Sequence, residues 1–140
     1  NEGFLQGESA KALRYRKEIG GKNIKVFADV HVKHGSHAIV NDRPVSEQAG
    51  DVEFFDADVT IATGNRTGDP TPISEIEAIR KGTFLPVIIG SGLTEANAAK
   101  IMKEADGAIV GSSLKKDGNW WNRVEVERVK RLVAEVEKLR

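Results

Sequence analysis

The chain has 140 residues and a mass of 15.3 kDa, which is the size of one ordinary domain. Lys and Arg number 21, as do Asp and Glu, and this balance gives no sign of the basic surface that nucleic acid attracts. The absence of cysteine excludes disulfides, thiolate zinc sites and a cysteine nucleophile. No apolar run approaches the roughly 20 residues that a membrane helix needs. We therefore expect a globular cytoplasmic protein that neither binds nucleic acid nor spans a membrane.

Helical and extended segments are predicted to alternate along the chain. The predicted order is helix 9–19, strand 24–30, helix 46–55, strand 58–63, helix 71–81, strand 85–89, helix 94–104, strand 107–110 and a last helix. Thr71 is expected to cap a helix that has Pro72 at its first position, Thr94 to cap the next one, and Asn122 to cap the last. The Arg, Lys and Glu residues of the last helix are expected to form a solvated face.

This alternation is typical of an α/β fold with a parallel sheet and crossover helices. The strands are apolar throughout, as strands buried on both faces require. An open doubly wound sheet and part of a (β/α)8 barrel share the pattern. In both, ligands bind at the carboxyl ends of the strands, so functional residues are expected in the loops that follow the strands.

Three ionisable side chains follow one another at the end of the first predicted strand. Asp29, His31 and Lys33 share one face if the strand continues, because successive side chains point to opposite faces. A carboxylate, an imidazole and an ammonium so close together can exchange protons or pair with an anionic substrate. These residues are the candidate catalytic set, with Asp29 or His31 as acid or base and Lys33 as electrostatic stabiliser or nucleophilic amine. The alternative is a structural set of ion pairs.

The same segment contains a D-x-H-x-x-H spacing formed by Asp29, His31 and His34. His31 and His34 are three residues apart and would diverge on a regular strand. We therefore expect no metal site, and no cofactor is predicted for the chain.

Two small-residue turns follow the third and fourth predicted strands. Glycine lets backbone N–H groups approach an anion, serine adds a hydroxyl, and a following helix favours negative charge. Tight turns between strand and helix need glycine in any case, so simple turn chemistry is the alternative. The predicted phosphate-binding residues are Gly90, Ser91, Gly92, Gly111 and Ser112.

Further candidates for substrate binding are His34, Thr67 and Lys115. Lys115 comes after the second small-residue turn and could reach a ligand as a point charge. Trp120 and Trp121 are interpreted as a packing or interface pair rather than as a stacking platform.

Several segments together resemble the BtpA/SgcQ family, in order and along essentially the whole chain. The segments are 9–16 (SAKALRYR), 28–34 (ADVHVKH), 63–70 (TGNRTGDP), 90–97 (GSGLTEAN) and 105–115 (ADGAIVGSSLK). The resemblance implies a TIM barrel of the ribulose-phosphate-binding type, with residues 1–140 as a single partial domain that forms its carboxyl-terminal half. A complete barrel has about 250 residues. We therefore expect this half to pair with a second copy or with the missing amino-terminal half, because half a barrel leaves strand edges uncovered.

The residues and the resemblance together lead to two hypotheses. In the first, the protein binds a phosphorylated sugar or nucleoside-like metabolite at the strand ends, with lyase, isomerase and nucleosidase chemistry all open. In the second, it is a non-catalytic assembly or stability factor, since the family's namesake is linked to photosystem I biogenesis. An apolar surface around Trp120 and Trp121 would favour the second hypothesis.

Overall fold

The computed structural model describes residues 6–139, which form alternating helices and strands. The elements in chain order are α1 (Ser9–Glu18), β1 (Phe27–Asp29), α2 (Val45–Phe54), β2 (Val59–Ala62), α3 (Ile73–Arg80), β3 (Val87–Ile89), α4 (Glu95–Ile101), β4 (Gly107–Ala108) and α5 (Val126–Glu137). Three short 3-10 helices lie in the loops, namely η1 (Ala38–Val40), η2 (Ser112–Leu114) and η3 (Lys116–Gly118).

The four strands form one parallel sheet in the order β1-β2-β3-β4. Ala28 pairs with Thr60, Thr60 with Val87, and Ile88 with Gly107. Each pair of neighbouring strands is connected through a helix, which is the connection that parallel strands require. The predicted α/β fold class with parallel (β/α) units is thus confirmed.

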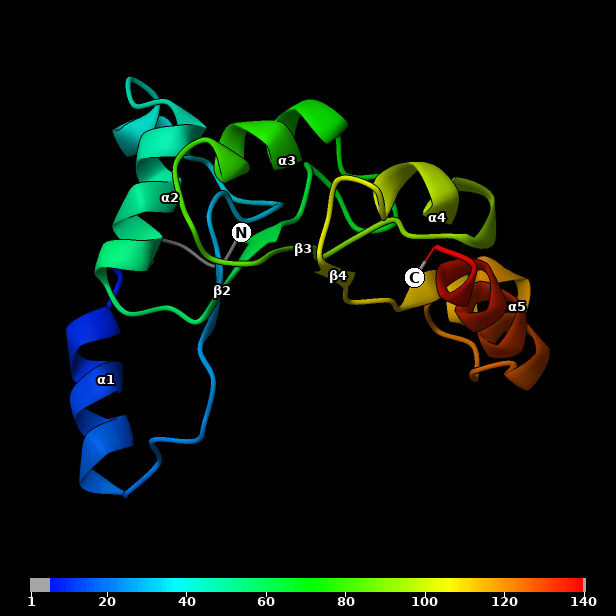
Figure 1. Ribbon diagram of the computed structural model, residues 1–140, viewed down its shortest axis with the longest axis horizontal. Coiled ribbons are helices and arrows are strands. Elements are labelled where there is room, and N and C mark those ends of the chain that lie inside the picture. The colour runs from blue at the N-terminus through cyan, green and yellow to red at the C-terminus, as the bar shows by residue number, and fades with distance from the viewer. Residues whose placement is uncertain (1–5, 140) are drawn as a thin grey trace.

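The core lies between the sheet and the helices that follow β1, β2 and β3. In Figure 1, α2, α3 and α4 lie along one side of the strands, with α1 near the β1 end and α5 at the other. Ile76 and Ile79 of α3 and Val87 and Ile89 of β3 are completely buried. Leu132 extends this core into α5.

Both outer strands have an edge that no other strand covers within residues 6–139. β1 and β4 are the end strands of the sheet, and side chains near these edges remain exposed. Phe27 in β1 and Ile109 just after β4 each keep 51% of their surface exposed. Such exposure of large apolar side chains marks a surface that another segment or chain can cover.

The first strand is shorter than the predicted 24–30. Its partner β2 begins only at Val59, so residues before Phe27 have no strand residue to pair with. The Asp58 carboxylate accepts a 2.8 Å hydrogen bond from the Val26 N–H, which is thereby satisfied without a ladder.

Two of the predicted helix starts are also wrong. The Thr71 hydroxyl donates to the carbonyls of Ala62 and Ser91 instead of capping, and Pro72 takes the N-cap position of α3. The Asn122 amide donates to the Lys116 carbonyl, and the chain stays extended until α5 begins at Val126. In both cases the side chain expected to cap the helix is engaged by a residue outside that helix. No helix among residues 6–139 has the length and apolar character to span a bilayer.

Candidate functional site

The turn after β3 requires glycine at both ends. Gly92 has a φ of +73°, and a Cβ there would collide with the backbone oxygen of Asp69. A Cβ on Gly90 would lie 2.8 Å from the Ile61 side chain and 2.9 Å from that of Thr63. The two glycines therefore have a structural role, whatever they bind.

Ser91, between these glycines, holds the neighbouring loop in place. Its side-chain oxygen accepts a hydrogen bond from the Gly68 N–H at 3.1 Å and donates to the Arg66 carbonyl at 3.4 Å. Its carbonyl accepts from the Thr71 hydroxyl at 3.3 Å. Ser91 is only 6% exposed, so loop 65–71 is fixed against the turn.

The turn after β4 is joined to the turn after β3. Gly111 leads into η2, and the Ser113 hydroxyl donates a 2.6 Å hydrogen bond to the Leu93 carbonyl. A Cβ on Gly111 would meet no atom within 4 Å, so sterics alone do not explain glycine there. Ser112 begins η2 and is partly exposed.

The two turns form the wall of one pocket with a volume of about 580 Å³. A cavity of this size is in the range of small-molecule sites. All the predicted phosphate-binding residues line it, namely Gly90, Ser91, Gly92, Gly111 and Ser112. Lys33 and Thr67 line it as well, whereas Asp29, His31, His34 and Lys115 do not.

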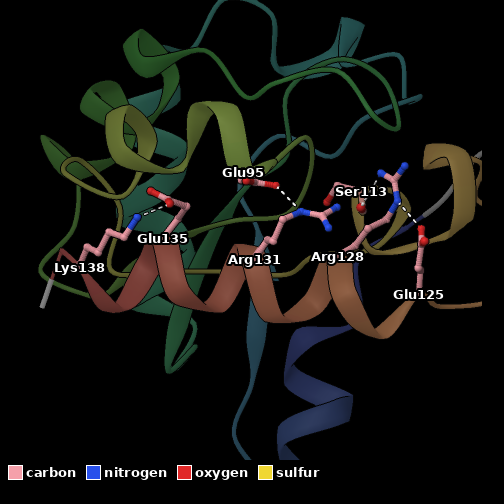
Figure 2. A network of polar contacts seen from close by, with 7 residues as sticks. All are labelled: Glu95, Ser113, Glu125, Arg128, Arg131, Glu135 and Lys138. Carbon is pink, nitrogen blue, oxygen red and sulfur yellow. Dashed lines mark hydrogen bonds and ion pairs between the residues drawn. The ribbon is translucent and has the colours of Figure 1, made fainter.

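Arg128 and Arg131 of α5 form another wall of this pocket, which the sequence interpretation missed by treating the last helix's charges as solvated. The Arg128 Nε donates to the Glu125 carboxylate at 2.7 Å, and its Nη1 to the Ser113 carbonyl at 3.5 Å. The Arg131 Nε donates to the Glu95 carboxylate at 3.0 Å (Figure 2). The sequence offered one signal for the position of Arg128. It lies four residues before Leu132, which is buried, and this spacing places the arginine beside the packed face of α5.

The segment after β1 leaves the strand at Val30, so the predicted pleat does not continue through His31 and Lys33. The buried Thr63 hydroxyl holds this segment instead. Its Oγ1 accepts from the Lys33 N–H at 3.0 Å and donates to the His31 carbonyl at 3.2 Å. The Lys33 Nζ then reaches the Gly90 carbonyl at 2.8 Å. One of the three candidate catalytic side chains thereby lies at the predicted phosphate turn.

Asp29 and His31 have shifted pKa values. Partial burial raises the pKa of the Asp29 carboxyl, and the nearby Lys33 ammonium opposes that rise. Burial lowers the pKa of the His31 imidazole, as does the positive charge of His37, whose ring centroid lies 3.6 Å away. Shifts of these kinds are common at functional sites.

Another carboxylate lies beneath the loop after β2, and sequence reasoning did not single it out. The Glu75 Oε1 accepts hydrogen bonds from the backbone N–H groups of Thr63 at 3.1 Å and Gly64 at 3.2 Å. Burial raises the pKa of Glu75, while these two bonds oppose the rise. Glu75 therefore fixes the backbone of the residue that positions Lys33.

The remaining candidates for substrate binding are engaged elsewhere. The His34 Nε2 lies 3.0 Å from the Thr67 hydroxyl and accepts from the Thr67 N–H at 3.2 Å, which links the loops after β1 and β2. Lys115 donates to the Trp120 carbonyl at 2.8 Å. Within residues 6–139, no group of three or more His, Asp or Glu side chains is arranged to hold a metal ion.

Sequence comparison relates this chain to proteins about twice its length. The BtpA family matches residues 1–138. The chain belongs to the BtpA family. It is 36% identical to an uncharacterized mitochondrial protein of Caenorhabditis elegans, covering 100% of this chain and 50% of that protein. It is 34% identical to the photosystem I biogenesis protein BtpA of Synechocystis, covering 92% and 45%. The chain thus spans about half the length of the curated relatives it matches.

Solved structures similar to this BtpA-family chain agree with the fold. Phosphoribosyl anthranilate isomerase of Thermus thermophilus aligns with a TM-score of 0.61 at 13% identity, covering 96% of this chain and 70% of that one. Tryptophan synthase of Mycobacterium tuberculosis aligns with a TM-score of 0.56 at 20% identity, covering 98% and 48%. At these identities the similarity shows the TIM-barrel type of fold and nothing about the reaction.

Proposed function

We propose that this BtpA-family protein binds a phosphorylated sugar or nucleoside-like metabolite at the carboxyl ends of its strands. The observation that carries the proposal is that five predicted phosphate-binding residues, from two separate turns, line one pocket. Backbone N–H groups in small-residue turns suit phosphate oxygens, and TIM barrels often bind phosphate after their last two strands. No metal or cofactor is part of the proposal.

The reacting part of the ligand would face the segment after β1. Lys33 connects the pocket with the segment after β1. It lines the pocket, and its ammonium lies close enough to interact with the Asp29 carboxylate. Asp29 or His31 would transfer the proton, and Lys33 would stabilise negative charge or act as the nucleophilic amine. Lyase, isomerase and nucleosidase reactions all need such groups. His34 and Thr67 would shape the rim of the site, and Lys115 would approach the ligand once it leaves the Trp120 carbonyl.

Calorimetric titration with ribose 5-phosphate and with ribose tests the binding proposal. We expect the phosphorylated sugar to bind and ribose to bind at least about tenfold more weakly, because charge-assisted hydrogen bonds to the phosphate would be lost. Equal binding of the two sugars, or binding of neither, would contradict the proposal. The catalytic part fails separately if Asp29→Asn combined with Lys33→Ala leaves the cellular role of the protein intact.

A non-catalytic role in assembly is the second candidate. The rings of Trp120 and Trp121 lie 4.0 Å apart, and the residues are 56% and 77% exposed. Exposed tryptophan is enriched at protein interfaces. The Synechocystis relative is named for photosystem I biogenesis. Loss of the cellular role on replacing both tryptophans with serine, with ribose 5-phosphate binding unchanged, would support this candidate over the first.

We further propose that the uncovered edges of β1 and β4 pair with a second copy of this half barrel or with the amino-terminal half of a barrel. The exposed Phe27 and Ile109 support this pairing. Sedimentation should show a species larger than the chain's 15.3 kDa, and a stable monomer would contradict the pairing. The cytoplasmic location predicted from the composition likewise remains a proposal.

A further inference from the structure

We infer that Arg128 and Arg131 of α5 bind the anionic group of the ligand directly, and that they set the preference of this pocket for a dianionic phosphate. The inference rests on the proposed phosphate-binding function and adds to it the side chains that supply the charge. The two arginines are one helical turn apart, so their side chains leave α5 on the same side.

The way the guanidinium groups are held supports this role. A guanidinium has five N–H donors in a planar fork. Among the described residues, Arg131 uses only Nε, which donates to Glu95, and Arg128 uses Nε and Nη1. Figure 2 shows both side chains extending from α5 between their carboxylate partners. The carboxylates thus fix the side chains through Nε, and both terminal nitrogens of Arg131 and the Nη2 of Arg128 remain for a ligand.

The charge of the pocket fits a phosphate monoester. Its lining contains three cationic side chains, Lys33, Arg128 and Arg131, and the single carboxylate of Glu95, which gives a net charge of +2. A phosphate monoester carries nearly two negative charges at neutral pH. Lys33 donates one N–H to the Gly90 carbonyl, and the free terminal nitrogens of the two arginines offer further donors for the anion. Arg also matches phosphate in geometry, because its fork can donate two parallel hydrogen bonds.

The experiment measures ribose 5-phosphate binding by calorimetry in the whole protein and in Arg128→Gln, Arg131→Gln and the double variant. We expect each single substitution to weaken binding about tenfold and the double variant to weaken it further. Lys130→Gln is the matched control. Lys130 lies on the same helix and pairs with Glu127 three residues earlier, as Arg128 pairs with Glu125, but it does not line the pocket. Its substitution should change the affinity less than about twofold.

The outcomes separate this inference from the function on which it rests. If the wild-type protein does not bind ribose 5-phosphate, the proposed function itself fails. If the wild-type protein binds it and the arginine variants match Lys130→Gln, the arginine inference alone is overturned. Arg128→Lys and Arg131→Lys keep the charge and lose the fork, so a loss of affinity smaller than that of the Gln variants supports direct contact. Wild-type affinity in both Lys variants would overturn the preference for a planar donor.

Discussion

The turn after β3 and the segment after β1 both lie at the carboxyl end of the sheet, but they are held in different ways. Ser91 in this turn is buried, and a Cβ on either neighbouring glycine would collide with atoms of β2 or of the loop that follows it. The segment after β1 follows an end strand of the sheet, which has a neighbouring strand on one side only within the described residues. One threonine hydroxyl, from Thr63, holds its backbone at two points. The predicted phosphate site is thus built within this chain, whereas the predicted catalytic segment depends on a few contacts.

Gly92→Ala tests how the turn after β3 is held, and it should have the largest effect. Alanine at a φ of +73° costs about 1–2 kcal/mol, and the collision of its Cβ with Asp69 adds to that cost. We expect the free energy of unfolding, measured in urea, to fall by more than about 2 kcal/mol, with loss of ribose 5-phosphate binding.

Gly20→Ala is the control for this substitution. Gly20 has nearly the same φ, +72°, but a Cβ there would meet no atom within 4 Å. Its replacement should therefore cost only the backbone strain of about 1–2 kcal/mol and leave binding unchanged. Equal destabilisation by the two alanines would show that the packing against Asp69 is not what fixes the turn.

Thr63→Val tests how the segment after β1 is held, and it should have an intermediate effect. Valine keeps the shape of the side chain but leaves the Lys33 N–H and the His31 carbonyl without their hydrogen-bond partner. The substituted side chain is buried, since Thr63 is 2% exposed. We expect a loss of about 1–3 kcal/mol in unfolding free energy and faster hydrogen exchange at the Lys33 amide.

Thr63→Ser keeps the hydroxyl and should retain the slow exchange at Lys33. If the Val variant exchanges no faster than the Ser variant, the hydroxyl does not hold this segment. Thr63→Val loses the hydroxyl, whereas Thr63→Ser loses only a methyl group. The difference in exchange rate between the two variants therefore reports how the hydroxyl positions the Lys33 backbone.

Local signals in the sequence predicted the alternation of elements, the parallel sheet and the residues of the two small-residue turns. Strand-end glycines can be identified in this way because a tight turn after a strand is a local requirement. Thr94 is the N-cap of α4 as predicted, and the side-chain Oδ1 of Asn97 accepts a hydrogen bond from the Thr94 N–H at 2.8 Å. Asn122 failed as a cap because the bridge between Lys115 and Val124 keeps the chain extended there.

The position of Arg128 and Arg131 beside the pocket could not be predicted from local signals, because it depends on how α5 packs against α4. Arg131 pairs with Glu95, 36 residues away in sequence, and no local pattern indicates that contact. Thr63 presents the same difficulty, since one hydroxyl at the end of an apolar strand gives no sign of the segment it holds. Sequence therefore located the strand ends, and tertiary contacts determine which side chains meet there.

The pH dependence of the segment after β1 should show the smallest effect. The pKa of His31 is lowered from 6.5 by burial and by His37, so the unfolded chain takes up a proton first as the pH falls. Stability should therefore decrease below about pH 6.5 and level off once the folded imidazole is protonated. Asp29 acts in the opposite direction and at lower pH, because its pKa is raised from 3.8. NMR titration should show the pKa of His31 rising in His37→Gln, and an unchanged value would mean that burial alone causes the shift.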